Sequence, residues 1–202
     1  SITACIECPP GRFGNESKRI DSQGGCHTCK KGFYCMGGTS QFPCPSGKYN
    51  NLTGQSSNMS CIECAPGKFG QSNAQISEAL ACKICDKGFV CSGITSIEPC
   101  PIGTFNNRSQ QANLDSCIPC PGGKYGVHPG QANATSGCRV CEKGFYCPPG
   151  NGRLRFGCKK GTYNNLTGQV YNTSCLSCPS GKYGDYRRNS MFSVSSGGTG
   201  LG

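Results

Sequence analysis

Apolar positions in this chain are isolated, and the most regular of them is a single aromatic residue. It closes the string Cys-x-x-Gly-x-aromatic, which ten cysteines begin and in which only Val90 replaces the aromatic residue. The glycine suits a turn with positive φ or a close backbone approach, and the aromatic residue suits a short extended segment. The pattern therefore predicts turns, loops and β-ladders of about two to four residues, with the aromatic rings packed on neighbouring disulfides.

Helix signals are weak along the whole chain. One helix-like stretch, Ala74 to Leu80, is too short to be stable on its own. The last stretch, Asp185 to Gly202, loses the cysteine pattern and is expected to be a C-terminal departure or a loosely ordered end. The chain starts at Ser1 in mid-pattern without a visible signal segment, as expected for a mature chain or a fragment of a longer one.

The cysteines repeat with a period of 56 residues, which becomes 58 across a two-residue insertion in the third copy. All 20 cysteines follow this rule, and such self-similarity indicates a tandem array. The array divides into repeat 1 (residues 1–60), repeat 2 (61–116), repeat 3 (117–174) and a partial repeat with a low-complexity tail (175–202). We call each unit that begins with the Cys-x-x-Gly-x-aromatic string a mini-module. Each mini-module is expected to contact mainly its neighbours along the chain, which predicts an elongated molecule.

The composition points to crosslinks in place of a hydrophobic core. Of the 202 residues 35% are hydrophobic, but 20 of these are cysteine and none is tryptophan. Glycine and proline add 31 and 13 residues, which are poor in the interiors of helices and strands. These figures predict a small disulfide-rich fold without a large core. No apolar run approaches the roughly 18 residues that a membrane-spanning helix needs.

Two chemistries compete for the cysteines. A zinc-ribbon spacing, Cys-x2-Cys-x17-Cys-x2-Cys, begins at Cys5, Cys61 and Cys117, but it leaves other equally periodic cysteines unused. Disulfides use 18 of the 20 cysteines if each cysteine of the aromatic string closes onto the next cysteine, leaving Cys5 and Cys178 over. Interleaved pairing within each repeat remains an open alternative. The pairs favoured are Cys8–Cys26, Cys29–Cys35, Cys44–Cys61, Cys64–Cys82, Cys85–Cys91, Cys100–Cys117, Cys120–Cys138, Cys141–Cys147 and Cys158–Cys175.

N-glycosylation sequons point to the outside of the cell. Three lie in repeat phase, each within an Asn-Asn-x-Thr/Ser string after the aromatic residue, and two more share a second phase. Such sequons are typical of surface loops in secreted proteins, where disulfides also persist. We therefore expect N-linked glycans, disulfides in preference to zinc, no metal ion and no cofactor. The candidate sites are Asn15, Asn51, Asn58, Asn107, Asn133, Asn165 and Asn172.

Strings such as Cys44-Pro-Ser-Gly-Lys-Tyr49, Cys120-Pro-Gly-Gly-Lys-Tyr125 and Cys178-Pro-Ser-Gly-Lys-Tyr183 resemble the cysteine-rich modules of tumour-necrosis-factor receptors. They look more like the ephrin-receptor-like repeats of many protist surface proteins. The resemblance spans residues 5 to 184 and implies an elongated extracellular array of disulfide-bonded modules. It does not imply catalysis. The five residues between Cys29 and Cys35 are fewer than receptor modules usually have, which argues against receptor-type ligand binding.

Catalytic chemistry has little support in the sequence. The two histidines, His27 and His128, stand at non-equivalent repeat positions, and ten carboxylates are scattered without an acid/base pair. The net charge of +10 favours solubility, or attraction to acidic glycans, over nucleic acid for a secreted chain. Basic residues gather at Lys18-Arg19, Lys30-Lys31, Arg153 to Arg155, Lys159-Lys160 and Arg187-Arg188.

The expected function is therefore structural. The sequence predicts a secreted or cell-surface, N-glycosylated rod that forms part of a filament, flagellar appendage, cell coat or stalk. Its expected partners are other copies of itself, joined end to end or otherwise. The alternative is a receptor or adhesion ectodomain that binds a protein or glycan. The third copy departs most from the others, with Pro148-Pro149-Gly150-Asn151-Gly152-Arg153, and a distinct copy favours that alternative.

Overall fold

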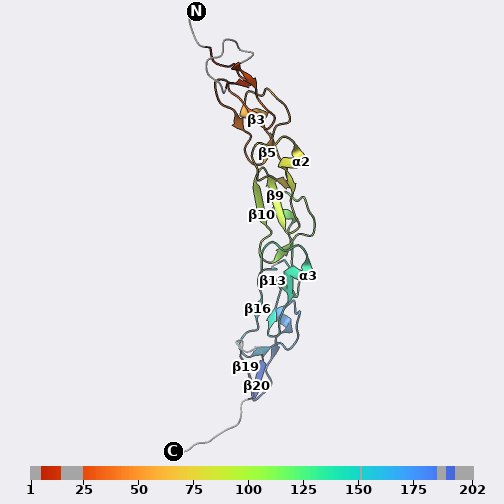
Figure 1. The fold of residues 1–202 in the computed structure, drawn as a ribbon. Coiled ribbons are helices and arrows are strands. Elements are labelled where there is room, and N and C mark those ends of the chain that lie inside the picture. The colour runs from red at the N-terminus through yellow and green to blue at the C-terminus, as the bar shows by residue number, and fades with distance from the viewer. Residues whose placement is uncertain (1–5, 15–24, 151, 186–189, 194–202) are drawn as a thin grey trace, which may run out of the picture. The chain divides into compact units, whose positions relative to one another are not determined.

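The computed structural model describes residues 6–14, 25–150, 152–185 and 190–193. Over these residues the chain forms ten two-stranded antiparallel sheets, each made of two strands that are consecutive in the chain. Most strands are only two residues long. The first strand of each pair follows a turn glycine, and the second strand of every pair but the last ends just before a cysteine. Figure 1 shows the hairpins following one another along the chain.

The paired strands are β1 (Arg12–Phe13) with β2 (His27–Thr28), β3 (Phe33–Tyr34) with β4 (Phe42–Pro43), β5 (Lys48–Tyr49) with β6 (Ile62–Glu63), β7 (Lys68–Phe69) with β8 (Lys83–Ile84), β9 (Phe89–Gly93) with β10 (Ser96–Pro99), β11 (Thr104–Phe105) with β12 (Ile118–Pro119), β13 (Lys124–Gly126) with β14 (Cys138–Val140), β15 (Phe145–Tyr146) with β16 (Phe156–Gly157), β17 (Thr162–Tyr163) with β18 (Leu176–Ser177), and β19 (Lys182–Asp185) with β20 (Ser190–Ser193).

Each repeat contains three kinds of mini-module, which differ in the distance between the bonded cysteines. The separations are 18, 6 and 17 residues, as in Cys64–Cys82, Cys85–Cys91 and Cys100–Cys117. The mini-modules with a separation of 17 contain a single 3-10 turn: η1 (Asn58–Ser60), η2 (Leu114–Ser116) or η3 (Asn172–Ser174). The order of the three kinds repeats along the chain, so the sequence period is also a structural period.

The helix expected at Ala74 to Leu80 is wrong in its first half. The helix α2 begins at Glu78 and ends at Ala81, whereas Ala74 has a left-handed φ of 56° that no α-helix tolerates. An equivalent turn, α3 (Ala134–Gly137), occurs 56 residues later, where the sequence Ala-Thr-Ser-Gly gave no helix signal. The side chain of Asn133 caps α3 by accepting a hydrogen bond from Ser136 N at 2.8 Å.

Disulfides form most of the buried interior. Among the described residues, 15 of the 20 buried hydrophobic residues are cysteines. Aromatic rings cover them as expected: Phe13 packs on Cys29 and Cys35 of the following mini-module. Phe69 and Tyr125 cover the equivalent disulfides in the other repeats, and Tyr49 packs on the pair Cys64 and Cys82. The described chain therefore has several small sulfur-aromatic clusters and no large hydrophobic core.

Backbone hydrogen bonds join the mini-module with the six-residue separation in each repeat to both of its neighbours at equivalent positions. In the mini-module closed by the Cys29–Cys35 disulfide, the carbonyl of Cys35 accepts a hydrogen bond from Gly11 N. The amide of Cys35 donates to Gln55 O, and both bonds are 2.8 Å long. The same two bonds recur 56 residues later, and again in the third copy. The recurring pairs are Gly67 N to Cys91 O at 2.7 Å, Cys91 N to Gln111 O at 2.9 Å, Gly123 N to Cys147 O at 2.8 Å and Cys147 N to Gln169 O at 2.8 Å.

The chain divides into two compact units. One comprises Ser1–Glu98 with Ser109–Leu114, and the other comprises Pro99–Arg108 with Asp115–Gly202. Each of the backbone bonds described above lies within one unit. The repeat boundaries at residues 60, 116 and 174 describe the period of the sequence and stay a prediction of domain organisation.

Candidate functional site

Nine disulfides close the mini-modules, and they are the nine pairs that the sequence favours. The bonded residues have Cα atoms 5.5 to 6.0 Å apart, within the ordinary range for a disulfide. Both cysteines of each short-loop pair, such as Cys29–Cys35, are fully buried. Within the described part of the chain, no group of three or more His, Cys, Asp or Glu side chains is arranged to hold a metal ion.

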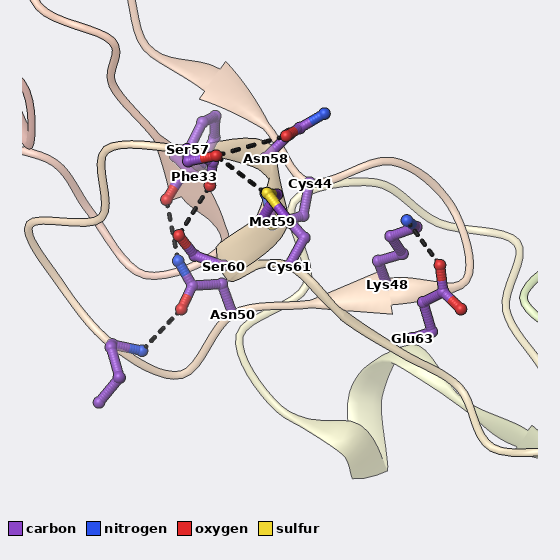
Figure 2. Close-up of a disulfide and its surroundings, with 11 residues drawn as sticks. Phe33, Cys44, Lys48, Asn50, Ser57, Asn58, Met59, Ser60, Cys61 and Glu63 are labelled. Atoms are coloured by element: carbon purple, nitrogen blue, oxygen red, sulfur yellow. Dashed lines mark hydrogen bonds and ion pairs between the residues drawn. A yellow bond between two sulfur atoms is a disulfide. The ribbon is translucent and has the colours of Figure 1, made fainter.

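The polar feature that recurs in all three repeats is a buried asparagine, which directly follows β5, β11 and β17. Asn50 and Asn106 are 1% exposed and Asn164 is 3% exposed, and they are the buried polar residues of the described chain. The Nδ2 of Asn50 donates to Phe33 O at 3.0 Å, while its Oδ1 accepts from Leu52 N at 3.0 Å (Figure 2). Asn164 makes the equivalent bonds with Phe145 O and Leu166 N. A buried amide satisfied in this way fixes the loop that follows it.

The backbone of Asn50 extends this arrangement to a third mini-module. Its N–H donates to Gln75 O at 3.0 Å, and its carbonyl accepts from Gly32 N at 2.8 Å. Gly32 and Phe33 belong to the mini-module before Asn50, and Gln75 belongs to the one after it. One residue therefore ties three consecutive mini-modules through both its side chain and its main chain.

The sequon asparagine comes directly after the buried one and faces solvent. Asn51, Asn107 and Asn165 are exposed, as are the hydroxyl-bearing residues Thr53, Ser109 and Thr167 that complete their sequons. The buried asparagine accepts from the amide two residues later, as Asn50 does from Leu52, and this tight turn leaves the residue between them at the surface. Exposure is required for a glycan on the folded chain, so these three positions have the geometry of glycosylation sites.

The two sequons that share the second repeat phase lie on 3-10 turns. These turns stand beside the disulfides whose cysteines are 17 residues apart. Asn58 begins η1 and Asn172 begins η3, and both are exposed. Figure 2 shows Asn58 next to the Cys44–Cys61 disulfide, where its Oδ1 accepts a long bond of 3.4 Å from Ser57 Oγ. Asn133, which caps α3, is also exposed. Asn15 lies outside the described residues.

An open hollow of about 340 Å³ lies beside Asn58, lined by Lys48, Asn58, Met59, Cys61 and Glu63. Lys48 Nζ and Glu63 Oε1 are 2.8 Å apart and form an ion pair across the β5–β6 hairpin (Figure 2). The one acid and the one base of the hollow therefore neutralise each other. Their side chains are 27% and 54% exposed, so the pair contributes little to stability.

A second polar cluster joins Arg155, at the end of the insertion of repeat 3, to residues earlier in the same repeat, and the sequence did not predict it. Arg155 forms an ion pair with Glu142, and its Nη1 donates to Tyr125 Oη at 3.3 Å. Tyr125 Oη donates in turn to Glu142 Oε1 at 3.1 Å. The guanidinium carbon of Arg155 also lies 4.5 Å from the ring centroid of Phe145. The insertion, around Pro149 to Arg155, was the visible signal, but it does not tell which of its side chains packs against the rest of the repeat.

Cys178 is the free cysteine of the described chain and is half-buried. It begins the tenth aromatic string, whose hairpin β19–β20 forms although the repeat places Ser196 where a bonded cysteine would stand. The hairpin fold therefore continues to Ser193, inside the stretch from Asp185 onward that loses the cysteine pattern. Cys5, the other cysteine left over by the pairing rule, lies outside the described residues.

No known protein family model and no curated protein matches this chain. In the described part of the chain, no helix has the length and apolar character needed to cross a membrane. The established description is therefore a tandem array of small cysteine-rich mini-modules, each with one hairpin and most with one disulfide.

Proposed function

We propose that this chain is a structural extracellular glycoprotein, a disulfide-stapled and N-glycosylated rod within a filament, flagellar appendage, cell coat or stalk. The observation that carries the proposal is the recurrence of the same backbone bonds between mini-modules, from Gly11 to Cys35 and Cys35 to Gln55 onward. Joints that repeat without variation suit a load-bearing array, because each mini-module supports the next in the same manner. Catalysis is no part of the proposed role.

The proposed location rests on the chemistry of the crosslinks and sequons. Nine disulfides persist in an oxidising compartment and are rare in the cytosol. Six of the seven sequon asparagines lie among the described residues, and all six are exposed. The resemblance to the ephrin-receptor-like repeats of protist surface proteins agrees with this location, and we include membership of that group in the proposal.

The test is to secrete the chain from a eukaryotic cell and to follow both its chemistry and its assembly. We expect non-reducing peptide mass spectrometry to find the nine disulfides and glycans on the exposed sequons. We expect electron microscopy to show thin rods that associate with each other. We also expect the rods to survive a metal chelator and to be digested by trypsin only after a reductant is added. Monomers that never associate would contradict self-assembly.

The second candidate function is a receptor or adhesion ectodomain, and the polar cluster of repeat 3 favours it. Arg155, Glu142 and Tyr125 have no equivalent in the first two copies, where the same positions hold Gln41, Lys30 and Phe13, or Ile97, Asp86 and Phe69. A purely mechanical array has no need for one distinct copy. A soluble monomer with one saturable protein partner would support this candidate over the structural one.

A further inference from the structure

The positive charge of the chain is concentrated in repeat 3. Residues 117–174 contain seven Lys and Arg against a single acid, whereas residues 61–116 contain four against five. Residues 1–60 are intermediate, with six against three. The three repeats share the same order of mini-modules and the same joints, so the fold does not impose this difference in charge. Charge needed only for solubility would be spread more evenly.

Four of these basic residues gather around one hairpin, β15–β16. Cys158 N donates to Gly144 O at 2.8 Å, which continues the hairpin by one residue pair, so Lys143 directly precedes the paired segment and Lys159 and Lys160 directly follow it. The guanidinium of Arg155 returns over the ring of Phe145, two residues from Lys143. We call Lys143, Arg155, Lys159 and Lys160 the basic hairpin surface, and all four are exposed.

Arg155 is held in place before any ligand arrives. It is fixed by the carboxylate of Glu142, by Tyr125 Oη and by the faces of two aromatic rings, yet its side chain remains 40% exposed. A guanidinium offers five donors in a planar fork that matches the oxygens of a sulfate group. A pre-organised fork loses less entropy on binding than a free side chain does.

We propose that the basic hairpin surface binds a sulfated polysaccharide. For a secreted chain, sulfated and carboxylated polysaccharides are the abundant polyanions, because anionic lipid is concentrated on the cytoplasmic leaflet. The inference rests on the proposed extracellular location but not on the structural role, so polysaccharide binding and self-assembly can each fail without the other. Repeat 1 carries uncharged residues at three of the four positions, namely Gln41, Pro45 and Ser46, and repeat 2 carries Ile97, Pro101 and Ile102.

The natural repeats supply the variants for the test. Lys159→Pro with Lys160→Ser installs the residues of repeat 1, where the same turn forms: Lys48 N donates to Pro45 O at 3.1 Å, as Thr162 N does to Lys159 O at 3.0 Å. Arg155→Gln likewise installs the repeat 1 residue. The matched control, Lys83→Gln with Lys87→Gln, removes two exposed lysines from repeat 2. Disulfide mapping of each variant checks that the scaffold is intact.

The probe is immobilised heparin, eluted with a salt gradient. We expect about a tenfold loss of affinity near 0.1 M salt for the repeat 3 double variant, because affinity for a polyanion scales with the number of cations engaged. The control should lose less than about twofold, and grafting Pro45→Lys with Ser46→Lys into repeat 1 should strengthen binding. Equal losses of affinity in the two double variants would mean that only the net charge of the chain determines heparin binding, which would overturn the proposal. Equal binding to desulfated heparin, or preferential binding to phosphatidylserine vesicles, would also overturn it.

Discussion

The side-chain amide of Asn50 donates to the carbonyl oxygen of Phe33, 3.0 Å away and 17 residues earlier in the chain. The neighbouring residue, Asn51, is exposed and carries the sequon. Two identical residues, adjacent in the sequence, therefore perform opposite tasks. One joins mini-modules in the interior, and the other exposes a sequon at the surface.

We predict that Asn50→Ala destabilises the array and that Asn51→Ala does not. The Asn50 change removes two hydrogen bonds and leaves Phe33 O and Leu52 N without side-chain partners, at a cost of about 3 kcal/mol in the free energy of unfolding. Guanidinium unfolding of unglycosylated, oxidised protein measures both variants, and hydrogen exchange at the Leu52 amide reports the local effect. Equal unfolding midpoints for the two variants would contradict the assigned role.

We predict that an alanine is tolerated at Gly161 and poorly tolerated at Gly47. These glycines occupy the same repeat position with φ of 77° and 78°, so each substitution has a similar backbone strain of about 1 kcal/mol. A Cβ at Gly47 would also overlap the backbone carbonyl of Ile94, whereas a Cβ at Gly161 meets no atom of the described residues within 4 Å. Packing overlap adds about 2 kcal/mol or more.

The yield of fully disulfide-bonded protein and its denaturant midpoint measure the difference between these glycine variants. Gly47→Ala should lower both more than Gly161→Ala does. A larger effect at Gly161 would mean that the close approach of Gly47 to Ile94 is unimportant.

The disulfides should be reduced in an order set by burial. The short-loop pairs, Cys29–Cys35 among them, have both cysteines fully buried, whereas Cys117 and Cys175 are half-buried. A thiolate must reach a sulfur atom to displace it, so the accessible pairs react first. We expect limited treatment with dithiothreitol followed by alkylation to label Cys100–Cys117 and Cys158–Cys175 before Cys29–Cys35. Early labelling of the short-loop pairs would show that local opening, and not static exposure, controls the reaction.

Cys178 should react with iodoacetamide in the native, unreduced protein. It is half-buried and has no disulfide partner, whereas the 18 bonded cysteines present no thiol. Peptide mass spectrometry after alkylation locates the label, and Cys178→Ser serves as the control for that peptide. Labelling at Cys29 or Cys35 without a reductant would contradict the pairing described here.

Much of the fold could be predicted from cysteine spacing because the disulfide loops are short and local. A loop of 6, 17 or 18 residues leaves few ways to close, and the aromatic residue at a fixed offset then covers the next disulfide, as Phe13 covers Cys29–Cys35. The turn glycines follow from the same string, and Gly11 has the positive φ that such a turn requires. These features depend on residues close together in sequence.

The features that were missed depend on contacts between mini-modules. Nothing within the string Asn50-Asn51-Leu52 indicates which asparagine is buried, because Phe33 and Gln75 lie in the neighbouring mini-modules. The recurrence of asparagine directly after the aromatic residue, at positions 50, 106 and 164, was the available signal. Arg155 was missed for the same reason, since its partners Tyr125 and Glu142 precede it by 30 and 13 residues.

The joints between mini-modules are made by peptide groups, such as Gly11 N to Cys35 O and Cys35 N to Gln55 O. Peptide groups are the same in every residue except proline, so a duplicated copy inherits these joints without any matching of side chains. Natural selection can then lengthen the array by gene duplication and let individual copies diverge at their surfaces. Repeat 3 keeps the shared joints while it carries a two-residue insertion and its own surface charge, and it illustrates how one copy can diverge at its surface without loss of the joints.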